Sequence, residues 1–250
     1  MKKAIIIGAS SGLGREVAQR LLEEGWKLGI CSRRIEALES IQEKYGKENV
    51  IAAKMDVMEE SAADVLAEMI EQLGSPDLFF LASGIGVQNR ELDLEKEIKM
   101  IRTNSEGMVR LVVSFLNYVK SNSCYTAGNK AHVAVITSVA GTAGLGSAPA
   151  YSATKKMQMT YLSALAQLSR MENIHVDFTD IRPGFVKTEI LNPNKHYPML
   201  MSLEDAGNHI MKGLKRRKRI LTFDWRFRLL VCFWSLIPRC VWERISFIKN

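Results

Sequence analysis

Short apolar runs rich in β-branched residues recur along this chain and alternate with longer stretches of mixed polarity. The first run covers residues 4–7 and the second covers 27–31. Such runs are typical of strands that are buried on both faces of a sheet. Comparable runs lie at 50–53, 78–81, 132–137, 174–181 and 220–223. We therefore predict seven strands.

The stretches between these runs carry the 3.6-residue spacing of amphipathic helices. Helical patterns start after Gly14, cover 61–73, 94–122 and 150–171, and start again at Ser202. Ser61 and Ser202 stand where N-caps are expected. Strands that alternate with helices predict an α/β protein with a doubly wound parallel sheet. We expect one domain over 1–223 and a C-terminal extension over 224–250.

The net charge of +7 is concentrated near the C-terminus. Residues 212–250 hold eleven Lys and Arg against two acidic residues, whereas residues 1–211 hold 23 basic and 25 acidic ones. The hydrophobic content of 47% and the charged content of 24% suit a globular domain. Because the basic run 215–219 is short and aliphatic residues follow it, we expect no nucleic-acid binding.

The four cysteines show neither metal-ligand spacing nor a disulfide framework. They are Cys31, Cys124, Cys232 and Cys240. Such cysteine usage suits a reducing compartment. Only four apolar residues precede Gly8, fewer than a secretory signal needs. We expect a cytoplasmic protein without a metal site.

A glycine-rich turn lies between the first strand and the first helix. Its residues are Gly8, Ala9, Ser10, Ser11, Gly12, Leu13 and Gly14. Glycines allow tight turning and close approach of the backbone to a pyrophosphate, and the helix N-terminus stabilises the phosphate charge. With the second strand, the turn completes a βαβ unit of the Rossmann type. We therefore expect a dinucleotide here.

The second strand is followed by Ser32, Arg33 and Arg34. An NAD-binding βαβ unit usually has an acidic residue at this place, which takes the ribose 2′-hydroxyl, and none is present. Arginine suits the 2′-phosphate of NADP. The alternative is that these arginines only begin a solvated helix. The pattern favours NADP(H) over NAD(H).

Tyr151 and Lys155 are four residues apart in a predicted helix, so their side chains share one face. A nearby ammonium lowers the pKa of a phenol, which allows the tyrosine to exchange a proton near neutral pH. By itself the pattern also fits a surface lysine beside a half-buried tyrosine. Other motifs must decide between the two interpretations.

Residues 1–211 resemble the short-chain dehydrogenase/reductase (SDR) family in the order and spacing of several motifs. These are the glycine turn, Asp56-Val57, Asn104-Ser105-Glu106-Gly107, Ile136-Thr137-Ser138, Tyr151 with Lys155, and the segment 183–188. The resemblance implies that Ser138 binds the substrate carbonyl and Tyr151 transfers a proton. It also implies that Lys155 stabilises the tyrosinate and binds the nicotinamide ribose, and that Asn104 helps to hold a proton-relaying water.

The same resemblance assigns the cofactor contacts. It implies that the glycine turn wraps the phosphates, that Arg33 (with Ser32 and Arg34) meets the 2′-phosphate, and that Asp56 and Val57 lie beside the adenine. Ser83 and Gly84 would follow the ribose, and Pro183, Gly184, Val186 and Thr188 would cover the nicotinamide carboxamide. The chain departs from the family at 81–84, where Leu-Ala-Ser-Gly replaces the usual Asn-Asn-Ala-Gly. The missing amides put the local geometry there in question.

Two apolar segments follow the motifs. Residues 189–203, with Pro193 and Pro198, are expected to cover the substrate, and residues 225–247 form a tail rich in tryptophan, aliphatic residues and arginine. Residues 229–237 are too few to span a bilayer. The tail fits a peripheral membrane helix, a helix packed on its own domain near the substrate mouth, or a subunit contact in a homo-oligomer such as a dimer or tetramer.

These observations predict an NADP(H)-dependent oxidoreductase that interconverts a carbonyl and a secondary alcohol. The apolar segments favour a lipophilic substrate such as a keto-lipid, a sphingoid ketone or a steroid-like alcohol. One rival is a reductase of a small polar ketone or sugar, with the tail used for assembly. Another is a cofactor-sensing or scaffold protein without turnover, against which the complete catalytic set argues.

Overall fold

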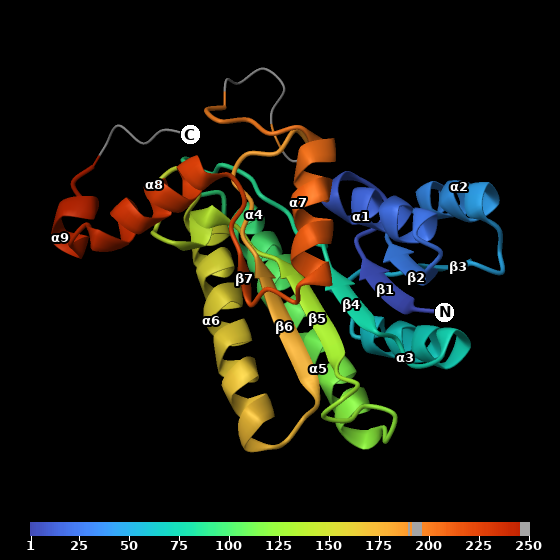
Figure 1. Cartoon of the computed structure of the whole chain (residues 1–250). Coiled ribbons are helices and arrows are strands. Elements are labelled where there is room, and N and C mark those ends of the chain that lie inside the picture. The colour runs from blue at the N-terminus through green and yellow to red at the C-terminus, as the bar shows by residue number, and fades with distance from the viewer. Residues whose placement is uncertain (190, 192–196, 246–250) are drawn as a thin grey trace.

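The computed structural model describes residues 1–189, 191 and 197–245. Seven parallel strands form one sheet in the order β3-β2-β1-β4-β5-β6-β7 (Figure 1). The strands are β1 (Lys3–Ile7), β2 (Lys27–Ser32), β3 (Val50–Lys54), β4 (Leu78–Leu81), β5 (Ala131–Ile136), β6 (Val176–Ile181) and β7 (Ile220–Leu221). The predicted doubly wound α/β fold is confirmed. The last two strands are shorter than expected, since β6 begins two residues later and β7 ends at Leu221.

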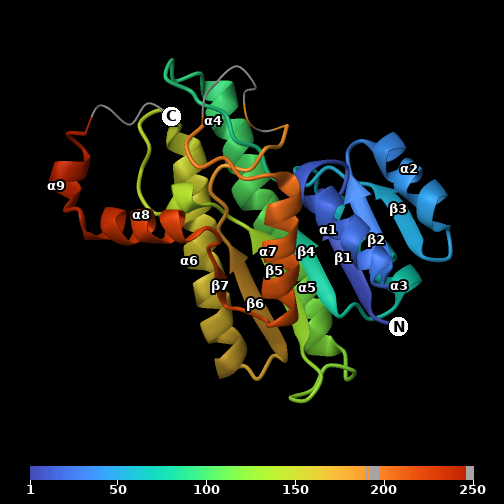
Figure 2. The same ribbon diagram turned by 45° about the horizontal axis from the view of Figure 1, so that its top comes forward.

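Helices cover both faces of the sheet (Figures 1 and 2). One face packs against α1 (Gly12–Glu23), α2 (Ile35–Tyr45) and α7 (Leu203–Lys215). The other packs against α3 (Ala62–Leu73), α5 (Gly107–Ser121) and α6 (Pro149–Met171), with α4 (Leu94–Ile101) beside α6. The two cores follow from side-chain alternation in the strands. Ile5 and Ile7 of β1 join the α3/α5/α6 core, whereas Ala4 and Ile6 join the opposite one.

The helix predicted over 94–122 is interrupted. A π-helical turn, Arg102–Glu106, separates α4 from α5, and the Gly107 N–H donates to the Arg102 carbonyl. A π turn widens a helix locally and is frequent at functional sites. Asn104 lies in this turn.

The two predicted N-caps differ in outcome. Ser202 accepts a hydrogen bond from the Asp205 N–H, so its cap is confirmed. Ser61 occupies the N-cap position of α3, as predicted, but it has a right-handed helical backbone and its side chain makes no cap hydrogen bond. An N-cap serine needs an extended backbone to reach the first turn.

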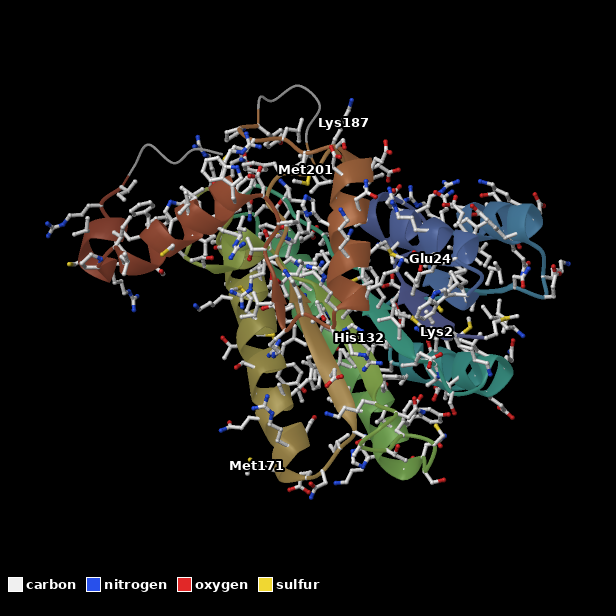
Figure 3. All side chains as sticks on the ribbon, in the orientation of Figure 1. Lys2, Glu24, His132, Met171, Lys187 and Met201 are labelled. Atoms are coloured by element: carbon white, nitrogen blue, oxygen red, sulfur yellow. The ribbon has the colours of Figure 1, made fainter. Side chains whose placement is uncertain are left out.

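The winding direction reverses between β1 and β4, so the loops after these strands diverge at the carboxyl edge of the sheet. The Gly8 N–H donates to the Cys31 carbonyl at 2.8 Å, and the Ser83 N–H donates to the Ile7 carbonyl at 3.1 Å. Figure 3 shows Lys187 and Met201 at this end of the molecule, and Met171, the last residue of α6, at the opposite end. Ligands of open α/β sheets bind at such an edge.

The tail forms α8 (Trp225–Leu236) and α9 (Arg239–Trp242), which extend beyond α6 at the same end of the molecule (Figures 1 and 2). Phe227 anchors α8, since its ring is buried and packs on Phe185 and Gly184. A Cβ at position 184 would overlap that ring, so glycine is required for this packing. Over the ranges that the structure describes, no helix has the length and apolar character needed to cross a membrane.

Candidate active site

Ser138 and Tyr151 lie at the carboxyl end of β5. Ser138 follows that strand and caps the short 3₁₀ helix Val139–Gly141, accepting from the Ala140 N–H at 3.1 Å. Tyr151 stands in the first turn of α6. Burial raises the pKa of Tyr151, whereas a side-chain hydrogen bond with Ser138 acts to lower that pKa. The serine is therefore both a helix cap and a neighbour of the phenol.

Lys155 lies one turn further along α6 and is buried. Its ammonium is 5.9 Å from the centre of the Tyr151 ring. It donates to the Ile136 carbonyl and to Gln158 Oε1, both at 3.0 Å. Burial lowers the pKa of Lys155 to about 8, and the charge of Asp180 opposes this shift. The lysine is therefore a buried cation with a lowered pKa, and it lies by the ring of the phenol.

The side chain of Asn104 ties the loop after β4 to α6. Its Nδ2 donates to the Ile85 carbonyl at 2.8 Å and to Thr154 Oγ1 at 3.1 Å. Its Oδ1 accepts from the Ile85 N–H at 2.9 Å. Two of these contacts hold Ile85, directly after the segment 81–84 that departs from the family, and the third joins Asn104 to α6.

Sequence reasoning missed two buried polar residues. Gln158 is buried on the Lys155 face of α6, and its Nε2 donates to the Asn104 carbonyl at 2.7 Å. Asp180 is buried in β6, where it pairs with Arg182 at 2.6 Å and accepts from Thr137 Oγ1 at 2.6 Å. The available signals were a polar residue three positions after Lys155 and an acid inside an apolar strand.

The glycine turn has the features of a phosphate cradle. Gly8 has φ of +89°, and a Cβ there would lie 2.6 Å from the Ser83 nitrogen. Ser11 precedes α1 with no side-chain cap, and no acidic residue stands in the first turn. The N–H groups at the start of α1 are therefore left for an anionic ligand. Leu13 is half-buried and Gly14 is buried in that first turn.

The two arginines after β2 differ in position. Arg34 directs Nε and Nη2 at Ser10 Oγ, each at 3.3 Å, and its Nη2 pairs with Glu189 at 3.1 Å. Ser32 Oγ bonds to the main chain of Arg34. Arg33 is exposed and has no hydrogen bond or ion pair with another described residue. The structure thus brings Arg34, rather than Arg33, to the glycine turn.

The other predicted cofactor residues lie along the same edge. Asp56 Oδ1 accepts from the Met58 N–H at 3.0 Å, and Val57 is buried against Gly107. A side chain at Gly84 would begin 3.5 Å from Lys155 Nζ, so this glycine borders the lysine.

The segment after β6 completes this edge. The Pro183 carbonyl accepts from the Val139 N–H at 3.1 Å, and Gly184 packs on the tail. Val186 is buried and Thr188 faces Gly12. Pro193 and Phe247 lie outside the described residues.

Comparison with known proteins identifies this arrangement. The sequence profile described as short chain dehydrogenase matches residues 2–197. The chain belongs to the short-chain dehydrogenase family. This SDR is 33% identical over 196 residues to an uncharacterized oxidoreductase of Listeria monocytogenes, with 76% of each chain covered. It is 27% identical over 249 residues to an uncharacterized oxidoreductase of Myxococcus xanthus, covering 97% and 95% of the two chains.

Solved structures share the fold of this SDR. A short-chain dehydrogenase from Streptomyces avermitilis superimposes with a TM-score of 0.79 at 20% identity, covering 93% of this chain and 92% of that one. An alcohol dehydrogenase from the archaeon Thermococcus sibiricus, complexed with 5-hydroxy-NADP, gives a TM-score of 0.74 at 24% identity, covering 89% and 96%. The chain is therefore an SDR oxidoreductase, and its family uses NAD(P)(H).

A cavity of about 720 Å³ lies between the tail of this SDR and the loop that joins Ser138 to α6. The loop contributes residues 142–147, and the tail contributes Trp234, Ile237 and Trp242 among others. The Trp242 Nε1–H donates to the Gly144 carbonyl at 2.7 Å, which fastens the tail over this loop. No group of three or more His, Cys, Asp or Glu side chains in the described part of the chain is arranged to hold a metal ion.

Proposed function

We propose that this SDR is an NADP(H)-dependent oxidoreductase that interconverts a ketone and a secondary alcohol. The observation that carries the proposal is the grouping of Ser138, Tyr151 and Lys155 at the carboxyl edge of the sheet. When bound, a reduced nicotinamide would supply the hydride for the carbonyl carbon. The residues of the chain supply everything needed at the carbonyl oxygen.

In the proposed reduction, Ser138 and Tyr151 both hydrogen-bond the carbonyl oxygen, and the Tyr151 hydroxyl gives it a proton. Lys155 keeps a positive charge beneath the ring and so stabilises the phenolate that remains. In the oxidation direction the phenolate accepts the alcohol proton. The pKa of Lys155 of about 8 means that the ammonium is predominantly charged at neutral pH.

Two features of the chain support NADP over NAD. Arg34 lies beside Ser10 of the glycine turn, and no acidic residue occupies 32–34, where an NAD enzyme needs one for the 2′-hydroxyl. The uncapped N-terminus of α1 suits the pyrophosphate that both cofactors share. The Thermococcus sibiricus enzyme, which shares this fold, was solved with an NADP derivative.

The cavity beneath the tail supports a lipophilic substrate. Its volume of about 720 Å³ exceeds what a small ketone fills, and the tail lines it with Trp234, Ile237 and Trp242 beside the charged Arg239 and Glu243. A keto-lipid, sphingoid ketone or steroid-like alcohol fits this chemistry. The alternative is a small polar ketone or sugar, with the tail serving assembly.

Turnover of NADPH against matched ketones tests the proposal. The panel would contain a long-chain ketone, a steroid ketone and a short polar ketone, each with NADPH and with NADH. We expect the highest kcat/KM with NADPH and a lipophilic ketone. A preference for the polar ketone would support the rival substrate class, and absence of turnover with every ketone would support a protein that binds the cofactor without catalysis.

The outer surface of the molecule supports two further parts of the proposal. Trp225, Leu229 and Phe233 form an exposed stripe on α8 between arginines, which suits a membrane surface with anionic lipids. Leu94 and Ile98 are exposed on α4, which suits a contact between subunits of a homo-oligomer. Salt-sensitive cosedimentation with anionic vesicles tests the first, and light scattering tests the second. A monodisperse monomer without vesicle binding would rule out both.

A further inference from the structure

Gln158 joins Lys155, which lies by the proposed proton donor, to Asn104. Its Nε2 donates to the main-chain carbonyl of Asn104 at 2.7 Å, and its Oε1 accepts from Lys155 Nζ at 3.0 Å. The residue is 1% exposed. The glutamine comes three positions after Lys155 on α6, so both side chains point to the same buried face.

The chemistry of the two partners fixes the orientation of this amide. A carbonyl can only accept a hydrogen bond and an ammonium can only donate. The amide nitrogen must therefore face Asn104, and the amide oxygen must face Lys155. If the amide were rotated by 180°, the Asn104 carbonyl would face Gln158 Oε1 and the Lys155 ammonium would face the Gln158 Nε2–H₂ donor. Such unpaired groups are costly in a buried site.

The π-helical turn presents the Asn104 carbonyl to α6. Residues 102–106 form this turn between α4 and α5, and the Asn104 side chain is already committed to Ile85 and Thr154. Its main-chain carbonyl is the atom that meets Gln158. The Asn104 carbonyl is thus bonded directly to the Gln158 side chain.

Two titratable groups face the Lys155 ammonium from the elements around it. Tyr151 lies on the same helix, with its ring 5.9 Å from Nζ, and Asp180 acts from β6. The remaining hydrogen-bonding partner is the Ile136 carbonyl of β5. Gln158 is therefore one of the two acceptors that hold the ammonium in the described structure, and it is the one that a side-chain substitution can remove.

We propose that Gln158 is a positioning residue that fixes the Lys155 ammonium under Tyr151 by bridging it to the Asn104 carbonyl. The inference rests on the proposed function. Each reduction takes one proton from Tyr151, and solvent must return one. An amide that passed on a proton would have to become an imidic acid, so Gln158 positions the ammonium and does not itself relay the returning proton.

Two substitutions separate positioning from packing. Gln158→Leu keeps the volume but leaves the Asn104 carbonyl and the ammonium without this partner. Gln158→Ala leaves space for a water that can bond to both. We expect kcat to fall about 10- to 100-fold in Gln158→Leu and only by roughly 3-fold in Gln158→Ala. Gln167→Leu, at an exposed position of the same helix, is the matched control.

The pKa of Lys155 gives a readout that needs no substrate. Nitrogen NMR of the lysine, assigned with Lys155→Met, follows its titration directly. We expect the pKa of Lys155 to fall in Gln158→Leu, because an acceptor of the ammonium is lost, and to rise by about one unit or more in Gln158→Glu, because a carboxylate replaces the amide. The alkaline limb of the kcat profile should move in the same direction.

The proposal is overturned if folded Gln158→Leu keeps the Lys155 titration and the kcat of the native protein. It is also overturned if Gln158→Leu and Gln158→Ala lose the same activity with unchanged pH profiles, since that result indicates packing alone. Should Gln158→Leu fail to fold, Gln158→Ala and Gln158→Glu provide the same comparison of titrations. If the native protein reduces no ketone, the proposed function fails, whereas the NMR titration still decides the role of Gln158.

Discussion

Replacing Arg34 with alanine should weaken binding of NADPH and leave NADH almost unaffected. The guanidinium of Arg34 lies beside Ser10 of the glycine turn, with its Nε and Nη2 each 3.3 Å from the serine Oγ. This is where a 2′-phosphate would meet a cation and a hydroxyl group together. NADH has no such phosphate, so it loses nothing when the cation is removed.

The expected magnitude follows from the exposure of Arg34. A hydrogen bond between charged groups contributes about 1.5–3 kcal/mol. The Arg34 side chain is 53% exposed, so solvent screening places the effect near the lower end. A loss of about 1.5–2 kcal/mol corresponds to a roughly 12- to 30-fold increase in the Kd for NADPH.

Two control variants make the assay specific. Arg33→Ala removes the neighbouring arginine, which has no polar partner among the residues that the structure describes, and should have the smaller effect. Glu189→Gln removes the acid that pairs with Arg34, an exposed ion pair of about 0–1 kcal/mol, and should tighten NADPH binding by up to roughly 5-fold. Nicotinamide fluorescence titration gives the Kd for each cofactor.

Equal losses for NADPH and NADH in Arg34→Ala would refute the reasoning, because they would indicate a general disturbance of the turn. Equal affinity of the native protein for both cofactors would refute the NADP assignment itself. If Arg33→Ala carried the larger loss, the residue that the sequence pattern favoured would be the correct one.

Three further predictions concern the phenol, the lysine and the tail. Tyr151→Phe should lower kcat at least ~100-fold and leave the Kd for NADPH unchanged, as measured by steady-state kinetics and fluorescence titration, and near-native turnover would mean another acid. Burial lowers the pKa of Lys155 from 10.5 to about 8, so the unfolded chain binds more protons between these values and stability rises with pH in that window. Between pH 7 and pH 10, the free energy of unfolding measured in urea should therefore rise by up to about 3 kcal/mol more in the native protein than in Lys155→Met. The same change in both proteins would contradict the lowered pKa of the buried lysine. A variant that lacks 237–250 but keeps Phe227 should have a KM for a long ketone that is raised far more than the KM for a short one. Equal changes in the two KM values would refute a role of the tail in binding a lipophilic substrate.

The predicted fold and the grouping of the predicted catalytic residues required little beyond the sequence. The apolar runs identified all seven strands, because a strand buried on both faces must be apolar at nearly every position. The spacing of Tyr151 and Lys155 fixed their shared helix face. What the pattern missed were changes of local geometry: the π turn at 102–106 has no distinctive hydrophobic period, and Ser61 has the composition of a cap without its backbone.

The sequence by itself determined the parallel sheet, the glycine turn and the order of the motifs. The reason is that local residue types predict which segments are buried and where the backbone can turn tightly. Tertiary packing alone decided which atoms meet. It brought Arg34 rather than Arg33 to Ser10, joined Gln158 to Asn104 across 54 positions, and fastened Trp242 to Gly144 across 98. Contacts of this kind depend on how whole helices and loops pack against the sheet. They join residues that are far apart in the sequence, so no local pattern in the chain predicts them.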